Sequence, residues 1–204
     1  FTPWALAYAI FNRKPILIAY ERTAHTERNC PAWRRMYRKF VNLFVDGYVV
    51  NGILTKQYLV SQGVSENVIF TGAMCADSFH LAEKVKMIKP EERLFFKREL
   101  HIEKKEIIYL YVGQLITRKG VAYLLDAWKE HILSHPNDHL LIVGEGPLFE
   151  DFVQGYGFMN SISFVGNIDY SRISEYYAVA DVFVIPTLED NWSLVVPEAM
   201  RSEE

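Results

Sequence analysis

The 204 residues are 50% hydrophobic and carry a formal net charge of −3. Such a chain can bury a core, and its small negative charge gives no reason to expect a nucleic-acid partner. No apolar run approaches the roughly 20 residues of a membrane-spanning helix, and the opening FTPWALAYAIFNRK has its charges after its apolar residues, unlike a signal peptide. The sequence therefore predicts a cytoplasmic protein.

Apolar runs rich in β-branched or aromatic residues predict strands buried on both faces of a parallel sheet. In chain order these runs are 15–20, 46–50, 67–72, 106–112, 139–144, 161–166 and 181–186. Between them, helical spacing is found at 33–44, 53–63, 120–133, 146–157 and 170–180. Because strand and helix alternate, we predict an α/β protein of doubly wound, Rossmann-like type.

One stretch, 79–105, breaks the alternation because it is charged, contains proline and has no strand pattern. We predict that it connects an N-terminal domain, 1–78, to a C-terminal domain, 106–204. The first domain has about three strands, fewer than the five or six of an average sheet. The second ends on a helix with no strand after it. We therefore expect a fragment in which both domains are incomplete.

A glycine-containing loop with a lysine, YVGQLITRKG, joins a buried strand to a helix at 111–120. A helix start offers unpaired N–H groups and the positive end of a dipole, so it stabilises an anionic group such as a phosphate. Lys119 would add a full charge. The alternative is that Arg118 and Lys119 are only solvated loop residues.

The next glycine pair, Gly144 and Gly146, resembles a dinucleotide-binding fingerprint only in part. Phe149 occupies the position of the third glycine, so a nicotinamide cofactor is not favoured. A tight turn with Pro147 in the first turn of a helix explains these residues structurally. Glu145 and Gly146 remain candidates for lining a cleft.

Two carboxylates, Asp190 and Glu198, are expected beyond the carboxyl ends of the last strands, the edge at which open α/β sheets bind ligands. An unpaired buried charge costs several kcal/mol, so these acids need hydroxyl groups or cations to contact. Sugar and ribose hydroxyls are suitable donors.

Proline is tolerated only in the first turn of a helix, so Pro197 predicts a helix start near Leu194. Ser193 or Asn191 is the predicted cap. The cysteines, Cys30 and Cys75, have no metal-type spacing and are interpreted as reduced structural thiols.

Four motifs in order carry a resemblance to a known family: VGQLITRKG, LLIVGEGP, ISFVGN and YYAVADVFVIPTLEDNWSLVVPEAM. Together they resemble the donor-binding domain of retaining glycosyltransferases of the GT-B fold, family 4 (glycosyl transferases group 1). The resemblance spans roughly residues 106–200. It implies two Rossmann-like domains, a nucleotide-diphosphate sugar as donor, and a glycan, a lipid or a small molecule as acceptor.

The resemblance also implies roles for individual residues. Lys119 would hold the donor diphosphate; Gln114 stands where the family has an arginine, which leaves Arg118 as a replacement. Glu198 would bind the ribose hydroxyls and Asp190 the hydroxyls of the donor sugar. The implied donor site comprises Gly113, Gln114, Arg118, Lys119, Glu145, Gly146, Gly166, Asn167, Glu189, Asp190, Asn191, Trp192, Ser193, Leu194 and Glu198.

Three parts of this site have narrower assignments. Gly166 and Asn167 would face the nucleotide base, and the Asn191–Leu194 backbone would face the phosphate or sugar. The spacing of the family's paired acids matches Asp190 and Glu198, with Asp where the family usually has Glu. Glu189 lies one residue out of register and is an alternative for that first position.

The N-terminal half, through PILIAYERTAHTERN, resembles the acceptor domain of the same family, in which a histidine faces the donor sugar. His25 is the candidate, so the predicted catalytic residues are His25, Lys119 and Asp190. The alternative is a loop histidine with local hydrogen bonds. Glu21 and Glu27 are weaker candidates.

The basic amphipathic helix at 32–44 allows two interpretations. Its arginines and aromatic residues could dock on anionic lipid, which predicts a peripheral membrane contact. Aromatic residues at helical spacing more often face a core, and that interpretation is favoured.

The predicted function is transfer of a sugar from a nucleotide-activated donor to an acceptor hydroxyl, with retention at the anomeric carbon. Lys119 and the helix starts would stabilise the leaving diphosphate, so no metal or other cofactor is expected. A nucleotide-sugar epimerase of the same fold and a non-catalytic nucleotide-sugar binding module remain alternatives.

Overall fold

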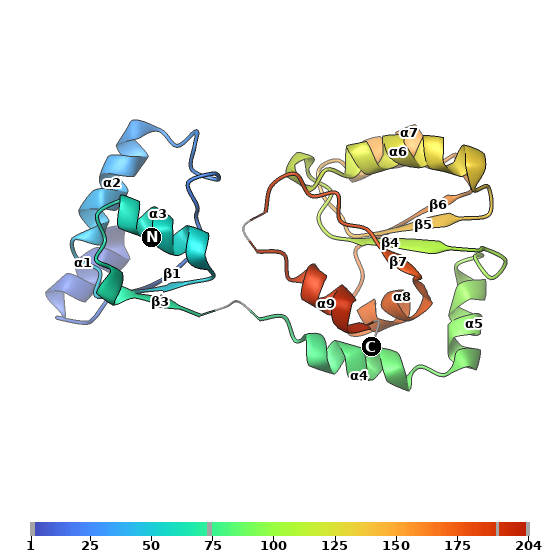
Figure 1. The fold of residues 1–204 in the computed structure, drawn as a ribbon, viewed down its shortest axis with the longest axis horizontal. Helices are drawn as coiled ribbons and strands as arrows, with labels where there is room; N and C mark the ends of the chain where they lie inside the picture. The colour runs from blue at the N-terminus through green and yellow to red at the C-terminus, as the bar shows by residue number, and fades with distance from the viewer. Residues whose placement is uncertain (1–2, 73–74, 191, 203–204) are drawn as a thin grey trace. The chain divides into compact units, whose positions relative to one another are not determined.

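The computed structural model describes residues 3–72, 75–190 and 192–202. The chain divides into two compact units, Phe1–Met74 (unit 1) and Cys75–Glu204 (unit 2). Each unit contains one parallel sheet. The predicted α/β architecture with strands paired in parallel is therefore confirmed in both units (Figure 1).

Unit 1 is built on a three-stranded sheet in the order β1-β2-β3. Its elements are α1 (Pro3–Phe11), β1 (Leu17–Tyr20), α2 (Ala32–Asn42), β2 (Gly47–Val50), α3 (Ile53–Ser61), the 3-10 turn η1 (Glu66–Val68) and β3 (Ile69–Thr71). Tyr48, Val50 and Leu59 form a core beneath α3. A second cluster joins Leu6 of α1 to Val41 of α2.

Unit 2 has a four-stranded sheet in the order β6-β5-β4-β7. Its helices are α4 (Ser78–Met87), α5 (Pro90–Glu99), α6 (Val121–Ser134), α7 (Phe149–Tyr156), α8 (Ile173–Val179) and α9 (Val195–Ser202), with 3-10 turns η2 (Thr117–Lys119) and η3 (Tyr170–Arg172). Its strands are β4 (Ile108–Val112), β5 (His139–Val143), β6 (Ile162–Gly166) and β7 (Val182–Phe183). Every residue of the central strand β5 is buried, because the sheet is covered on both faces.

Helices lie on both faces of this sheet, as a doubly wound fold requires. Figure 1 shows α6 and α7 over one face, and α4, α8 and α9 over the other. Two core clusters correspond to these two layers. Leu125 and Trp128 of α6 belong to one cluster, and Tyr176 of α8 and Ala199 of α9 belong to the other. Because all four strands are parallel, their carboxyl ends lie at one edge of the sheet.

The prediction that 79–105 is only a connection between domains is wrong. This segment forms α4 and α5, which pack against α8 and α9 inside unit 2. Leu81, Val85 and Phe96 are buried in the unit 2 core, so the charged residues of this stretch form the outer faces of amphipathic helices. The boundary accordingly falls after residue 74 rather than after residue 78.

The favoured interpretation of the 32–44 helix is also wrong for two of its aromatic residues. The side chains of Trp33 and Phe40 are 62% and 53% exposed, and Val41 is the residue of α2 that enters a core. The helix presents these two aromatic residues to the surface of unit 1 as the structure describes it, whereas Tyr37 packs partly buried against the cluster of Leu6 and Val41.

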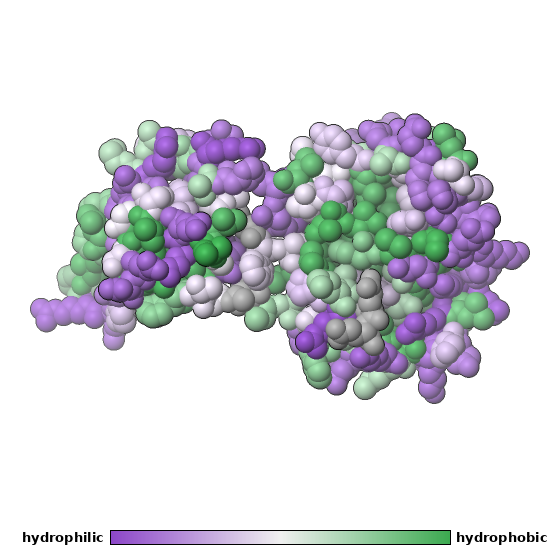
Figure 2. Space-filling model, viewed as in Figure 1, coloured by the Kyte–Doolittle hydropathy of each residue, from purple (hydrophilic) through white to green (hydrophobic). Residues whose placement is uncertain are grey.

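The edge strand β7 is shorter than the predicted run 181–186 and pairs with β4. Val182, Ile185 and Leu188 remain partly exposed there, and Figure 2 shows hydrophobic surface over β7 between α6 and α9. Within the described residues, no helix combines the length and apolar character needed to cross a bilayer.

Candidate functional site

The direction in which the chain crosses the sheet reverses between β4 and β7. The chain proceeds from β4 through β5 to β6 on one side, and β7 then returns to the other side of β4. In open α/β sheets, ligands bind at such a reversal. The loops after β4 and β7 therefore flank the expected binding edge.

These two loops are joined through their backbones. The carbonyl oxygen of Arg118 accepts hydrogen bonds from the N–H groups of Leu188 (3.0 Å) and Glu189 (3.2 Å). Gly120 has a φ of 70°, and a Cβ there would overlap the carbonyl oxygen of Pro186. Glycine is therefore needed where the lysine loop turns into α6.

A compact charged cluster results from this joining. Lys119 Nζ donates to Asp190 Oδ2 in an ion pair, and Arg118 Nη1 lies 3.7 Å from Asp190 Oδ1. Arg118 Nη1 also donates to the carbonyl oxygen of Glu189 at 3.2 Å. The Lys119 side chain is only 15% exposed, so the alternative of a fully solvated loop lysine is wrong.

The ion pair determines the ionisation of the acid. Burial would raise the pKa of Asp190, but the hydrogen bond and the charge of Lys119 outweigh it and hold that pKa below its ordinary value. Asp190 is consequently a carboxylate at neutral pH. It binds the ammonium group of Lys119, which the sequence analysis predicted to bind a phosphate of the donor.

A cavity of about 510 Å³ opens at the carboxyl ends of β4, β5 and β6, against the start of α9. Five of the predicted residues line it: Gly113, Gln114, Glu145, Asn167 and Glu198. Gly144 has a φ of 132°, and a Cβ there would overlap the carbonyl oxygen of Gly113. These two strand ends therefore approach closely, and both glycines line the cavity.

The carboxylate of Glu198 is held by two tyrosines. Tyr170 Oη donates to Oε1 at 2.9 Å and Tyr177 Oη donates to Oε2 at 3.5 Å. Glu198 is only 6% exposed, and none of the ion pairs among the described residues includes it. Burial and then the Glu198 carboxylate raise the pKa of Tyr170 to about 12, so the phenol remains a hydrogen-bond donor.

Sequence reasoning missed both tyrosines. They lie in YSRISEYY, immediately after the loop that carries Gly166 and Asn167. The expectation that Glu198 needs hydroxyl partners is met by the protein itself in this structure.

The predicted residues form two groups rather than one. Lys119 and Asp190 do not line the cavity, whereas Glu198 does. Tyr111 connects the groups: its Oη donates to the carbonyl oxygen of Gln114 at 3.0 Å, and its pKa responds to the charges of Arg118 and Asp190. Burial is the main reason that the pKa of Tyr111 rises to about 12.

Helix α9 starts close to the position predicted for it, but the predicted cap Ser193 does not cap it. The helix begins at Val195, one residue after the expected Leu194, and Pro197 falls in its first turn. Ser193 Oγ is buried without a hydrogen-bond partner, so its hydroxyl does not cap the helix. Trp192 is partly exposed, and Asn191 lies outside the described residues.

The remaining donor-site glycines have backbone roles. A Cβ on Gly146 would crowd the backbone of Leu115. Gly166 has a φ of 79° and accepts a hydrogen bond at its carbonyl oxygen from the N–H of Gly144 at 2.8 Å. Both glycines thus shape the loops that carry Glu145 and Asn167.

His25 belongs to unit 1, where it lies exposed in the turn after β1. Its carbonyl oxygen accepts from the N–H of Arg28 at 3.3 Å. Its role toward a donor sugar stays a prediction.

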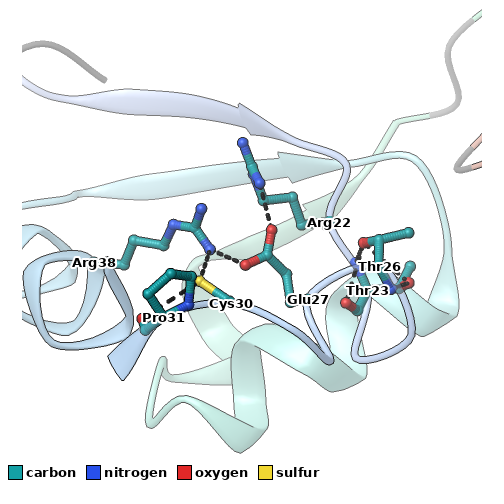
Figure 3. Close-up of polar contacts among 7 residues, drawn as sticks. All are labelled: Arg22, Thr23, Thr26, Glu27, Cys30, Pro31 and Arg38. Carbon is teal, nitrogen blue, oxygen red and sulfur yellow. Dashed lines mark hydrogen bonds and ion pairs between the residues drawn. The ribbon is translucent and has the colours of Figure 1, made fainter. Parts of the chain in front are cut away.

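Glu27, the weaker candidate in the same turn, is a buried carboxylate paired with two arginines. Its carboxylate accepts from Arg22 and Arg38, and Arg38 also contacts Cys30 Sγ at 3.4 Å (Figure 3). Burial would raise the pKa of Glu27, but hydrogen bonds from Arg22, Cys30 and Arg38 lower it to about 2. Glu27 is therefore a structural anion of unit 1.

No group of three or more His, Cys, Asp or Glu side chains suited to a metal ion occurs in the part of the chain that the structure describes. The polar groups at the binding edge are instead cations, hydroxyls and isolated acids.

Comparison with known proteins identifies the family. The model for "Glycosyl transferases group 1" matches residues 92–203, more than half of the chain. The protein belongs to the glycosyl transferases group 1 family.

Relatives within this family include an uncharacterized glycosyltransferase of Methanocaldococcus jannaschii, 33% identical over 115 residues, or 55% of this chain and 29% of the relative. The alpha-monoglucosyldiacylglycerol synthase of Acholeplasma laidlawii is 27% identical over 112 residues, or 52% of this chain and 27% of that protein.

A solved Anabaena protein in complex with UDP matches 97% of this chain and 54% of its own, with a TM-score of 0.77 and 14% identity. This likeness supports the GT-B fold predicted from the resemblance. The chain spans about three tenths of the length of these curated relatives and about half of this solved chain.

Proposed function

We propose that the protein transfers a sugar from a nucleotide-diphosphate donor to an acceptor hydroxyl, with retention at the anomeric carbon. One observation carries the proposal: Lys119 and Asp190, both predicted to bind the donor, pair between the loops after β4 and β7, and a cavity at the carboxyl ends of β4, β5 and β6 contains the second predicted acid, Glu198. Solved neighbours with UDP and with UDP-glucose support a nucleotide sugar as the donor.

The Lys119–Asp190 pair is proposed to open when the donor binds. The diphosphate replaces Asp190 as the partner of Lys119, because a phosphate offers more charge and more acceptor oxygens than one carboxylate. Asp190 is then released toward the hydroxyls of the donor sugar. Arg118, 47% exposed and bound to Asp190, supplies the second cation that the neutral Gln114 lacks.

The difficult step is departure of the diphosphate from an oxocarbenium-like carbon. Groups aimed at the developing negative charge lower this barrier. Lys119 and Arg118 are two such groups, and the unpartnered hydroxyl of Ser193 near the start of α9 is a third. The proposed reaction needs no metal, because these protein groups stabilise the leaving group.

The cavity is proposed to hold the nucleoside. Glu198 accepts hydrogen bonds from the ribose hydroxyls, sharing its oxygens with Tyr170 and Tyr177. Asn167 and the backbone of Gly166 face the base. His25 is proposed to face the donor sugar from unit 1, and a glycan, a lipid or a small molecule accepts the sugar.

The proposal is tested by incubating the protein with a panel of nucleotide sugars and measuring protection from thermal unfolding. A ligand that binds only the native state stabilises it in proportion to RT ln(1 + [L]/Kd), about 2.7 kcal/mol at 100 times Kd. One donor is expected to protect more than its free sugar does. If no nucleotide sugar of the panel protects more than its free sugar does, the donor site is contradicted.

The same panel separates the alternatives. A sugar product that forms from the donor without an acceptor favours a nucleotide-sugar epimerase. Donor protection without turnover in the presence of acceptors favours a non-catalytic binding module.

We also propose that the protein is cytoplasmic and contacts membranes through the outward face of α2. That face combines Arg35 and Lys39 with the exposed Met36, Phe40 and Leu43, a pattern typical of helices that lie in the membrane interface. The name of the Acholeplasma laidlawii relative includes a lipid, which is compatible with a lipid acceptor.

Leu43→Glu is expected to weaken binding to vesicles of mixed anionic and neutral lipid about tenfold, because it removes an exposed leucine that would insert into the membrane and adds a negative charge. Co-sedimentation with the vesicles measures this. Leu133→Glu, at a similarly exposed leucine of α6, is the matched control and should bind as the unaltered protein does. An equal loss in both variants contradicts the contact.

A further inference from the structure

A second cavity, of about 500 Å³, lies in unit 1 between β1 and one face of α2. The donor site in unit 2 does not use it. Its lining contains three arginines, Arg22, Arg34 and Arg38, but no carboxylate. This concentration of positive charge needs an explanation in a chain whose net charge is −3.

Helical spacing brings these cations together with aromatic groups. Trp33, Tyr37 and Val41 follow one another at intervals of four residues, so they lie in one column along α2. Arg34 and Arg38 lie in the neighbouring column, and both columns line the cavity. The wall of the cavity thus alternates flat apolar surface with guanidinium groups.

Two of the three arginines, Arg22 and Arg38, are preorganised by the buried carboxylate of Glu27. Its side chain is 5% exposed and it accepts one contact from Arg22 and one from Arg38 (Figure 3). Each guanidinium has five N–H donors, so most of them stay available after this pairing. One carboxylate opposite three guanidinium groups also leaves a net positive charge.

Two groups of the lining, the hydroxyl of Tyr37 and the guanidinium of Arg34, have no polar partner among the described residues. Tyr37 lines the cavity, and its Oη is buried with no hydrogen bond. Arg34 forms no ion pair; its guanidinium lies over the Trp33 ring, 5.1 Å from the centroid. A buried hydroxyl without a partner costs free energy, which a bound acceptor oxygen would offset.

We propose that this cavity binds a phosphate group. Planar guanidinium forks match the oxygens of phosphate, and a tyrosine hydroxyl donates a further hydrogen bond. Resting on the function proposed above, the phosphate belongs to the acceptor, either a soluble phosphate ester or a lipid phosphate. Nothing in the donor site requires this second anion.

The test is calorimetric titration of the protein with inorganic phosphate and with glycerol 3-phosphate at constant ionic strength. Arg34→Gln is expected to weaken binding about tenfold, the effect of losing one charge-assisted hydrogen bond. Tyr37→Phe should weaken it by a smaller factor without changing the shape of the wall. Arg35→Gln removes the same charge from a neighbouring position of α2 that does not line the cavity, and it should leave the binding of these two soluble probes unchanged.

Two results would overturn the site: no saturable binding of either probe, or an equal loss in Arg34→Gln and Arg35→Gln, which would indicate unspecific attraction. Vesicles of phosphatidic acid, compared with phosphatidylcholine, identify the source. Arg34→Gln weakens vesicle binding if the phosphate is lipidic and weakens only glycerol 3-phosphate binding if it is soluble.

Donor protection, measured on the same preparations, keeps the two proposals separate. Arg34→Gln should leave the protection by the best nucleotide sugar unchanged. If the unaltered protein binds phosphate but no donor protects it from unfolding, the proposed function is overturned and the anion site is still supported. Donor protection without phosphate binding would overturn the anion site alone.

Discussion

Lys119→Ala is expected to abolish the protection from thermal unfolding that the best nucleotide-sugar donor confers. Lys119 is the less exposed of the two cations in the charged cluster at the binding edge, so its charge is screened less by solvent than that of Arg118. Removing a close charge partner from a bound ligand costs about 3 kcal/mol, or about a hundredfold in affinity. At a fixed donor concentration, the shift in unfolding temperature caused by the donor should then become too small to detect.

The matched control is Lys129→Ala in the same unit. Lys129 Nζ also binds an aspartate, Asp126 Oδ1 at 3.1 Å, but on the outer face of α6. Its removal should leave donor protection intact. If Lys119→Ala is protected as well as the unaltered protein, Lys119 does not belong to the site.

Lys119→Ala should also change the protein without ligand. Asp190 would keep Arg118 at 3.7 Å as its remaining cation, and its pKa should rise toward the ordinary value. Comparing each variant with and without donor separates this change in stability from the loss of binding.

Glu27→Gln is expected to destabilise unit 1 by about 3 kcal/mol at neutral pH, the free energy that corresponds to lowering a carboxyl pKa from 4.5 to about 2. Glutamine keeps the shape but cannot neutralise Arg22 and Arg38. Hydrogen exchange of peptides from β1 and β2 measures this, while peptides from β4 and β5 of unit 2 should be unchanged.

The pH dependence gives a second test of the same network. Because the pKa of Glu27 is lower in the folded state, its stabilisation is complete above about pH 4.5 and is lost as the pH falls toward 2. Glu27→Gln should lack this decline. The control is Glu66→Gln, which removes an exposed ion pair with Lys56 and should cost far less stability, because solvent screens exposed pairs. A loss as large as that of Glu27→Gln would contradict the special role of the buried network.

Strand positions were predictable because parallel strands buried on both faces are nearly continuous apolar runs. His139–Val143 is the clearest example, with all five residues buried. The charged stretch 79–105 was misread because the buried Leu81 and Val85 lie four residues apart on one face of α4, and the charged residues around them hide that pattern.

The binding edge was predictable in outline because the carboxyl ends of parallel strands meet at one edge. This rule placed Lys119, Asp190 and Glu198 near one another. It did not predict that Lys119 and Asp190 pair directly, or that Tyr170 and Tyr177 bind Glu198, because side-chain contacts across 71, 28 and 21 positions have no local signal.

The sequence by itself determined the alternation of strands and helices, the loops that carry glycine, and the acids and the lysine at the strand ends. Those features depend on local periodicity and on residue type. Only the tertiary structure decided that α4 and α5 belong to unit 2, that Glu198 is buried beneath two tyrosines, and that Glu27 holds two arginines beside a cavity. Each of these depends on which distant segments the order of the strands brings into contact.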